Sequence, residues 1–192
     1  MNKPIILTGA LCIISSVFAA GPFGIEKGTK LDSLGKTKET ESGKYTFVPQ
    51  KTLPEFETYV ALVSDLQGVC WIKAIGNDIR TSPYGSELTS KFSKFEKKLS
   101  NIYGSNKQYD FLLADSMWNE PKDYLHALLE HERRLASVWG PEYNSKMTDD
   151  LKSVSLIASA TSLESGYIAI EYTFNNYEAC KEEISEQVAD AL

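Results

Sequence analysis

Two histidines are the side chains of this chain that best suit metal binding or acid–base chemistry. His126 and His131 lie five positions apart in a segment with a helical pattern. Metal ligands on one helix favour a spacing of four, as in H-E-x-x-H, whereas five residues rotate a helix by about 140° beyond a full turn. The two rings would therefore point to different sides. His126 and Glu130 would share a face, but two ligands do not make a metal site.

Other catalytic patterns are no stronger. A serine nucleophile is expected on a sharp strand-to-helix turn such as G-x-S-x-G, a pattern that this sequence lacks. The acid pairs Asp149-Asp150 and Glu182-Glu183 are of a kind common on protein surfaces, and nothing marks either pair as an acid–base couple. The sequence therefore predicts no catalytic residue, no metal site and no cofactor. A hydrolase that uses His126, Glu130 and nearby acids is the alternative to a non-enzymatic protein.

The first nineteen residues have the three parts of a secretion signal. A single positive charge at Lys3 precedes an apolar run over residues 4–18, and Val17 and Ala19 take the −3 and −1 positions of a cleavage site. The run is shorter than the ~20 apolar residues that span a membrane, which favours a cleaved signal over an anchor. We therefore predict a signal peptide over residues 1–19 and one domain over residues 20–192.

Lipidation at Cys12 is disfavoured because Leu11, rather than a small residue, precedes it. Cleavage after Ala19 places the mature domain in the periplasm or outside the cell. It removes one of the 20 basic residues, which leaves 19 against 26 acidic residues and a net charge of −7. Nucleic acid and anionic lipid both require a basic surface. Another protein is therefore the expected partner, with no nucleic acid and no stable insertion of the mature chain in a membrane.

Two cysteines remain after the signal, Cys70 and Cys180. In an oxidising compartment such a pair predicts a disulfide bond. A disulfide between Cys70 and Cys180 would close a loop of roughly 110 residues, for which the chain-entropy model gives a stabilisation of at most about 4 to 5 kcal/mol. Two buried thiols that never meet are the alternative.

Apolar segments predict a sheet. Residues 45–48, 56–63 and 69–76 are rich in β-branched and aromatic side chains, and a polar turn with a glycine joins the last two as a hairpin. A second hairpin is predicted from residues 154–160 and 167–174, in which apolar and small or polar residues alternate. Residues 36–44 are polar and indicate a loop.

Three segments predict amphipathic helices. The clearest begins at Ser82-Pro83 and has apolar residues at steps of three and four, namely Tyr84, Leu88, Phe92, Phe95, Leu99 and Ile102. The second is expected over residues 119–139 and the third over residues 176–191. Together the elements predict an α+β fold, with an antiparallel sheet built from two hairpins and amphipathic helices packed on one face.

Two features indicate a possible interaction surface. Trp71 follows Cys70 in a predicted strand, so Trp71 faces outward if Cys70 faces inward, and exposed aromatic residues anchor interfaces. Lys91, Lys94 and Lys98 line one face of the first long helix. A solvated helix face explains these lysines, and docking of a charged partner is the alternative.

Three short motifs carry a resemblance to known proteins. They are Phe23-Gly24-Ile25-Glu26-Lys27-Gly28-Thr29-Lys30-Leu31, Gly68-Val69-Cys70-Trp71-Ile72 and Gly166-Tyr167-Ile168. In outline the chain resembles small exported Gram-negative proteins of uncharacterised role, the beta-lactamase inhibitor protein family and the small lipoproteins of outer-membrane assembly. The sheet face that carries Trp71, together with the lack of a recognisable catalytic motif, favours a non-enzymatic protein-binding module, of the inhibitor or envelope-accessory type. The hydrolase above and an immunity or anti-toxin protein are the alternatives.

Overall fold

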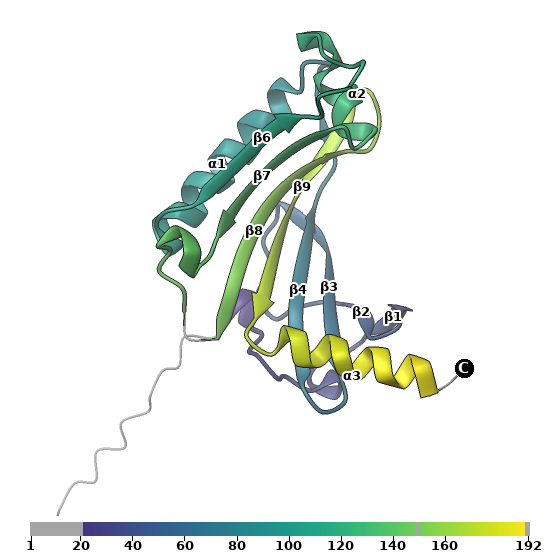
Figure 1. The fold of residues 1–192 in the computed structure, drawn as a ribbon. Helices are drawn as coiled ribbons and strands as arrows, with labels where there is room; N and C mark the ends of the chain where they lie inside the picture. The colour runs from purple at the N-terminus through teal and green to yellow at the C-terminus, as the bar shows by residue number, and fades with distance from the viewer. Residues whose placement is uncertain (1–20, 149, 191–192) are drawn as a thin grey trace, which may run out of the picture.

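The computed structural model describes residues 21–148 and 150–190, so the predicted signal over residues 1–19 lies outside the described part. Its elements are drawn in Figure 1. The strands are β1 (Lys38–Glu41), β2 (Lys44–Phe47), β3 (Phe56–Ser64), β4 (Gly68–Gly76), β5 (Ile79–Arg80), β6 (Lys107–Leu112), β7 (Arg133–Trp139), β8 (Leu151–Ala160) and β9 (Ser165–Phe174). The α-helices are α1 (Ser86–Tyr103), α2 (Tyr124–Leu129) and α3 (Tyr177–Asp190). Short 3₁₀ turns lie at Pro22–Gly24, Leu31–Leu34, Pro121–Asp123 and Pro141–Tyr143.

The strands form one antiparallel sheet in the order β1-β2-β3-β4-β9-β8-β7-β6, and β5 pairs with the start of β9. The hairpins β3–β4 and β8–β9 lie side by side in its middle, where Ile72 of β4 pairs with Tyr172 of β9. The expected α+β class with an antiparallel sheet is confirmed. The sheet is wider than two hairpins, because β1 and β2 extend it at one end and β6 and β7 at the other.

Helix α1 follows the predicted apolar stripe. Its inward side chains are buried, because the stripe recurs once per turn along the face that meets the sheet; they are Leu88, Phe92, Phe95, Leu99 and Tyr103. The two outermost residues of the predicted stripe, Tyr84 and Ile102, are exposed instead. The helix packs on β8 and β9, and each fully buried apolar side chain contributes about 1.5–3 kcal/mol.

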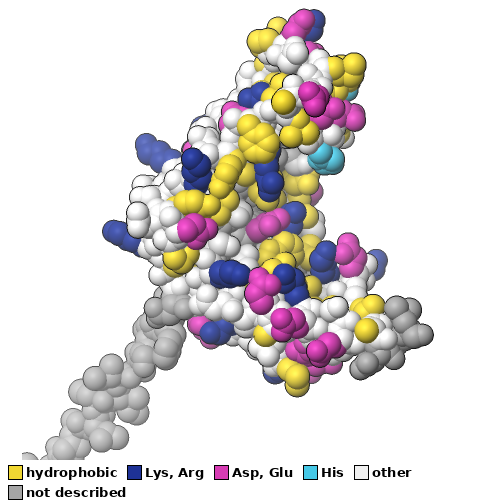
Figure 2. Space-filling view, in the orientation of Figure 1, with side chains coloured by type: hydrophobic (Ala, Val, Ile, Leu, Met, Phe, Trp, Pro, Cys, Tyr) yellow, Lys and Arg dark blue, Asp and Glu magenta, His cyan; other side chains and the backbone are white. Residues whose placement is uncertain are grey.

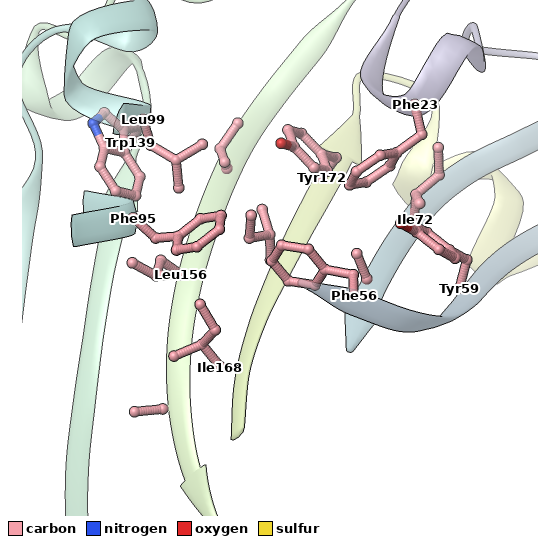
Figure 3. Packing of buried hydrophobic residues seen from close by; sticks show 14 of the residues in the cluster. Phe23, Phe56, Tyr59, Ile72, Phe95, Leu99, Trp139, Leu156, Ile168 and Tyr172 are labelled. Atoms are coloured by element: carbon pink, nitrogen blue, oxygen red, sulfur yellow. The ribbon is translucent and has the colours of Figure 1, made fainter. Parts of the chain in front are cut away.

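The N-terminal segment covers the same side of the sheet beside α1. The Phe23 ring meets the rings of Tyr59 and Tyr172 edge to face, with centroids 5.0 and 5.6 Å apart, and Phe56 meets Phe95 of α1 at 5.4 Å (Figure 3). These aromatic pairs join the segment, the sheet and the helix into one hydrophobic cluster. The side of the sheet that carries α1 is therefore the core side.

Helix α3 lies across β3 and β4 on the opposite side of the sheet. Its Cys180 is fully buried against Leu62 and Cys70, in a cluster separate from the main core. In Figure 1 α3 crosses in front of β4, whereas α1 lies behind the sheet. The expectation that all helices pack on one face is therefore wrong. A sheet has two faces, and the sequence of a helix alone does not determine which of them the helix will cover.

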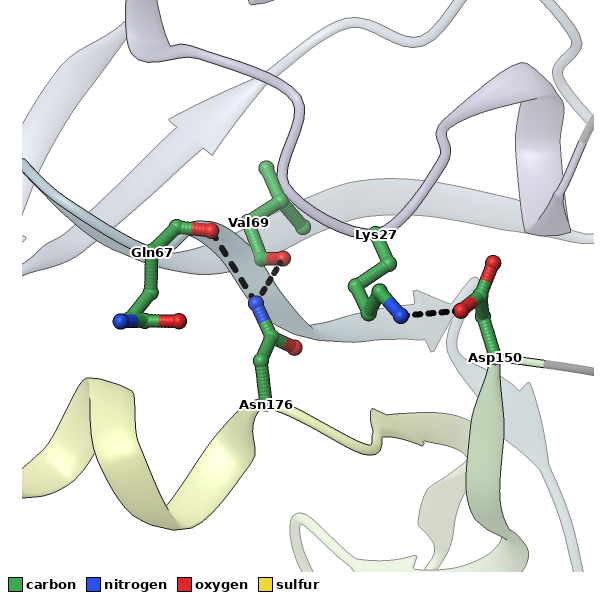
Figure 4. A network of polar contacts seen from close by, with 5 residues as sticks. All are labelled: Lys27, Gln67, Val69, Asp150 and Asn176. Carbon is green, nitrogen blue, oxygen red and sulfur yellow. Dashed lines mark hydrogen bonds and ion pairs between the residues drawn. The ribbon is translucent and has the colours of Figure 1, made fainter.

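The attachment of α3 to the β3–β4 hairpin is both covalent and polar. Cys70 and Cys180 form a disulfide, with Cα atoms 6.4 Å apart. The Asn176 side chain donates to the main-chain oxygens of Gln67 and Val69, at 3.0 and 3.2 Å (Figure 4). Glu183 accepts hydrogen bonds from the Ser64 hydroxyl at 2.7 Å and from the Leu66 N–H at 2.8 Å. The predicted pairing of the two cysteines agrees with this geometry.

An ion pair between Lys27 and Asp150 connects the N-terminal segment to the start of β8 (Figure 4).

The second predicted helix is wrong over most of its length. The segment expected as a helix over residues 119–139 folds as the short helix α2 followed by strand β7. The chain reverses at His131, which has a φ of 58°, a backbone conformation that is uncommon for residues other than glycine. Residues 36–44, expected as a loop, contain β1 and the start of β2. Within the described part of the chain, no helix is long and apolar enough to cross a membrane.

Candidate binding surface

The side of the sheet opposite the core is uncovered over β6, β7, β8 and β9. Helices α1 and α2 pack on the core side of these strands, and α3 covers β3 and β4 only around Leu62 and Cys70, so the uncovered side continues to Ile75 and Thr58. We call the uncovered part the open face. Figure 2 shows this side, with hydrophobic side chains in a band over the strands above α3 and with charged side chains beside them.

One row of paired residues crosses the whole open face. The strand registers place its members directly opposite one another, in the order Tyr109, Ala136, Ile157, Ala169, Ile75 and Thr58. Large and small side chains alternate along the first five positions. Ala136 and Ala169 are buried, at 2% and 1% exposed, between larger neighbours that are part exposed. The row is therefore an apolar strip with a corrugated surface.

Polar and aromatic side chains flank this strip. On one side Phe111 pairs with Arg134, and Phe111 is 44% exposed. On the other side Lys73 and Glu171 lie opposite each other and form an ion pair of 3.0 Å. The Tyr109 hydroxyl lies 2.9 Å from the Tyr143 hydroxyl, and this hydrogen bond raises the pKa of Tyr143. Aromatic residues and arginine are the types most enriched at the centres of protein interfaces.

Trp71 lies at the border between the open face and α3. The pairing of β3 with β4 shifts register between Leu62 and Val63, so that Cys70 is an extra residue opposite them. Such a bulge breaks the alternation of a strand. Cys70 and Trp71 therefore point to the same side, with Trp71 half-buried against the Cys70–Cys180 cluster. The simple alternation that set Trp71 opposite Cys70 is wrong, although Trp71 does lie on the side away from the main core.

The three predicted lysines lie on the other side of the molecule, on α1. The ammonium groups of Lys91 and Lys98 lie 5.5 and 4.4 Å from the centre of the Phe95 ring. Lys98 also pairs with Glu55 at 3.5 Å. Lys91 and Lys94 line a shallow hollow of about 530 Å³ that also contains the acids Asp78 and Glu87. Lys91 and Lys98 thus have partners within the molecule, and the structure does not bring the three lysines together with Trp71.

His126 and Glu130, the residues considered for catalysis, line neither this hollow nor the second one described below. His126 stacks on Trp118 with ring centres 3.5 Å apart, and its Nε2 lies 3.9 Å from Glu130. The second hollow, of about 300 Å³, is lined by residues such as Lys30, Tyr45 and Asp65. Among the described residues, no three His, Cys, Asp or Glu side chains lie together in a way that could hold a metal ion. The surroundings of His126 are those of a packed surface residue.

Most of the open face was missed by the sequence analysis. Tyr109 and Phe111 belong to β6, which was not expected as a strand, and Arg134 belongs to the segment expected as a helix. The alternation of Tyr109 and Phe111 with polar residues is a period-two pattern typical of a strand. This period-two pattern could have predicted strand β6 from the sequence.

Comparison with known proteins gives no further guidance. No protein-family model matches the chain, and neither a curated protein nor a solved structure matches it.

Proposed function

We propose that the mature chain is an exported protein-binding module, of the inhibitor or envelope-accessory type, that holds its partner on the open face. The observation that carries the proposal is the apolar strip from Tyr109 to Ile75, which no helix of the described chain covers. Large exposed apolar patches rimmed by polar residues mark interaction sites in proteins. A packed sheet holds such a patch rigidly, so that binding costs little conformational entropy.

The rim of the open face indicates the chemistry of the partner. Arg134 projects beside Phe111 and Lys107 beside Val138, while the nearest basic–acidic pair, Lys73 with Glu171, is already neutralised. Neither Arg134 nor Lys107 forms an ion pair with another described residue, which contrasts with the overall charge of the chain, −6. We therefore propose a protein surface with apolar side chains flanked by carboxylates as the partner.

Two features support export to the periplasm or the cell exterior. The N-terminal pattern is that of a secretion signal, and the paired cysteines suit an oxidising compartment. The resemblance to the beta-lactamase inhibitor protein family is a further reason to propose an inhibitor.

The test is capture of a partner from an envelope extract by the purified mature protein and by matched variants. Phe111→Glu and Ile157→Glu place a carboxylate on the open face, and we expect each to reduce capture at least about tenfold. Trp71→Ala tests the border with α3. The double variant Lys91→Ala with Lys94→Ala is the control on the opposite side, and it should bind like the wild type. Equal capture by all variants, or loss with the lysine variant alone, would refute the open face as the binding surface.

A further inference from the structure

The sheet ends in two free edges of very different character. At one end β1 has four polar residues, Lys38–Glu41, and a register irregularity between Glu39 and Glu41. Short charged strands and bulges are the usual means by which proteins prevent strands from adding to an edge. At the other end β6 has six residues, Lys107–Leu112, with an unbroken register and no proline. The β6 edge thus lacks the protection that β1 has.

The direction of the main-chain groups of β6 follows from its ladder with β7. The N–H of Leu113 donates to the oxygen of Glu132 at 2.8 Å. In an antiparallel pair, every second residue forms hydrogen bonds with the same neighbour, so Tyr109 and Phe111 face β7 in the same way. The alternate residues, Gln108 and Asp110, direct their N–H and C=O groups toward the free edge.

We propose that β6 pairs with the β6 strand of a second copy of this chain, antiparallel and about a two-fold axis at Tyr109. In this register Gln108 lies opposite Asp110 of the second copy, and the two exchange both main-chain hydrogen bonds. The Asp110 carboxylate accepts a hydrogen bond from Arg133 of its own copy at 2.6 Å, and an ionised carboxylate has further acceptor sites for the Gln108 amide of the second copy. On the open face Tyr109 meets Tyr109 of the second copy, and Lys107 lies over the ring of Phe111, a cation–π arrangement.

The alternative registers are less favourable. A shift of one residue would set the open face of one copy against the core side of the other. Of the two neighbouring registers that keep the faces aligned, the one centred on Asp110 would place the Asp110 carboxylates of the two copies opposite each other, and like charges directly opposite each other destabilise a sheet. The other, centred on Gln108, would pair only residues 107–109 of each strand. The register about Tyr109 is therefore the most favourable of the three.

The dimer goes beyond the proposed function and does not depend on it. Because the two-fold axis is perpendicular to the sheet, the open faces of both copies lie on the same side of one continuous sheet. A monomer that still captures a partner would refute the dimer alone. A dimer without any partner would refute the binding module alone.

Disulfide trapping tests the register directly. Residues opposite each other in a non-hydrogen-bonded pair have Cα atoms about 4.5 Å apart, within the range that a disulfide spans. Tyr109→Cys should therefore form a covalent dimer under mild oxidation, seen on a non-reducing gel. Asp110→Cys is the control, since in this register its Cα atoms are beyond the ~7 Å limit. Trapping through Asp110→Cys alone, or through neither variant, would overturn the proposal.

A second pair of variants tests the edge without changing the covalent state. Gln108→Pro removes an N–H that points away from β7, a position at which an edge strand tolerates proline, while Gln108→Ala keeps this N–H. In size-exclusion chromatography with light scattering, we expect Gln108→Ala to dimerise like the wild type. Gln108→Pro should raise the dimer dissociation constant at least about tenfold. A wild type that stays monomeric up to about 100 μM, or a proline variant that dimerises equally well, would overturn the proposal.

Discussion

The two halves of the sheet are covered in different ways. In the half that contains β3 and β4, the N-terminal segment packs on one side, and α3 covers part of the other side around Leu62 and Cys70. In the half that contains β7 and β8, α1 and α2 cover the core side and leave the other side open. The first half is therefore held together from both sides, whereas the second half exposes one whole side of its strands.

Two phenylalanines on the two sides of the second half give the largest expected difference. Phe92 on α1 is 1% exposed, whereas Phe111 on the open face is 44% exposed. Phe92→Ala should lower the free energy of unfolding by about 3–5 kcal/mol, because it leaves a cavity in a packed core. Phe111→Ala should lower it by less than about 1 kcal/mol. Urea unfolding followed by fluorescence measures both values, and equal losses would show that the open face is packed like a core.

The disulfide gives the next largest effect, in the first half. Replacing both Cys70 and Cys180 with alanine should lower the free energy of unfolding by about 2–4 kcal/mol, because the crosslink closes a loop with a sequence separation of 110 residues. The loss should begin in α3, which has few other apolar contacts with the sheet. Hydrogen exchange measures this directly. Protection that falls first in α1, with α3 unchanged, would contradict the proposed role of the crosslink.

Acid should weaken the same attachment by a smaller amount. Hydrogen bonds from Lys181 and Lys152 lower the pKa of Glu178 from 4.5 to about 2. Burial raises the pKa of Glu183, but hydrogen bonds from the Leu66 N–H and the Ser64 hydroxyl outweigh this effect, so its pKa is lowered. Because these folded-state pKa values lie below the unfolded ones, the stabilisation is present above about pH 4.5 and is lost as the pH falls toward 2.

The urea midpoint should therefore fall between pH 5 and about pH 2, and Glu183→Gln should make this fall shallower. Glu57→Gln, at an exposed position of β3, is the matched control for loss of one carboxylate. A control variant with the same shallower pH dependence would show that the effect comes from net charge and not from the attachment of α3.

The elements that were predicted correctly are those with strong local patterns. The stripe of Phe92, Phe95 and Leu99 on α1 and the two central hairpins could be identified because each pattern is complete within one segment. The position of α3 could not be predicted, since both sides of β4 carry apolar residues. The bulge at Cys70 also left no local signal, and it places Cys70 and Trp71 on the same side of the sheet.

Strand β7 shows why some strands could not be predicted from the sequence. Its core-side residues are Leu135, Ser137 and Trp139, and a serine in the middle looks like a polar interruption. The Ser137 hydroxyl is buried because Glu96 of α1 accepts its hydrogen bond, from a position 41 residues away. Without that partner the segment fits a helical spacing equally well. The open face was largely missed for the same reason, because its residues come from strands that pair only in the folded sheet.

The strand order has a consequence for how the molecule is made. Strand β9 is synthesised after every other strand of the described residues, yet it joins β4 to β8 at the centre of the sheet. Until β9 emerges, the earlier strands exist as two separate pieces with bare edges, and such intermediates aggregate readily. A protease that removed the last strand and helix would therefore do more than trim a tail. Without β9 the two parts of the sheet could not pair, and the protein would lose its folded structure.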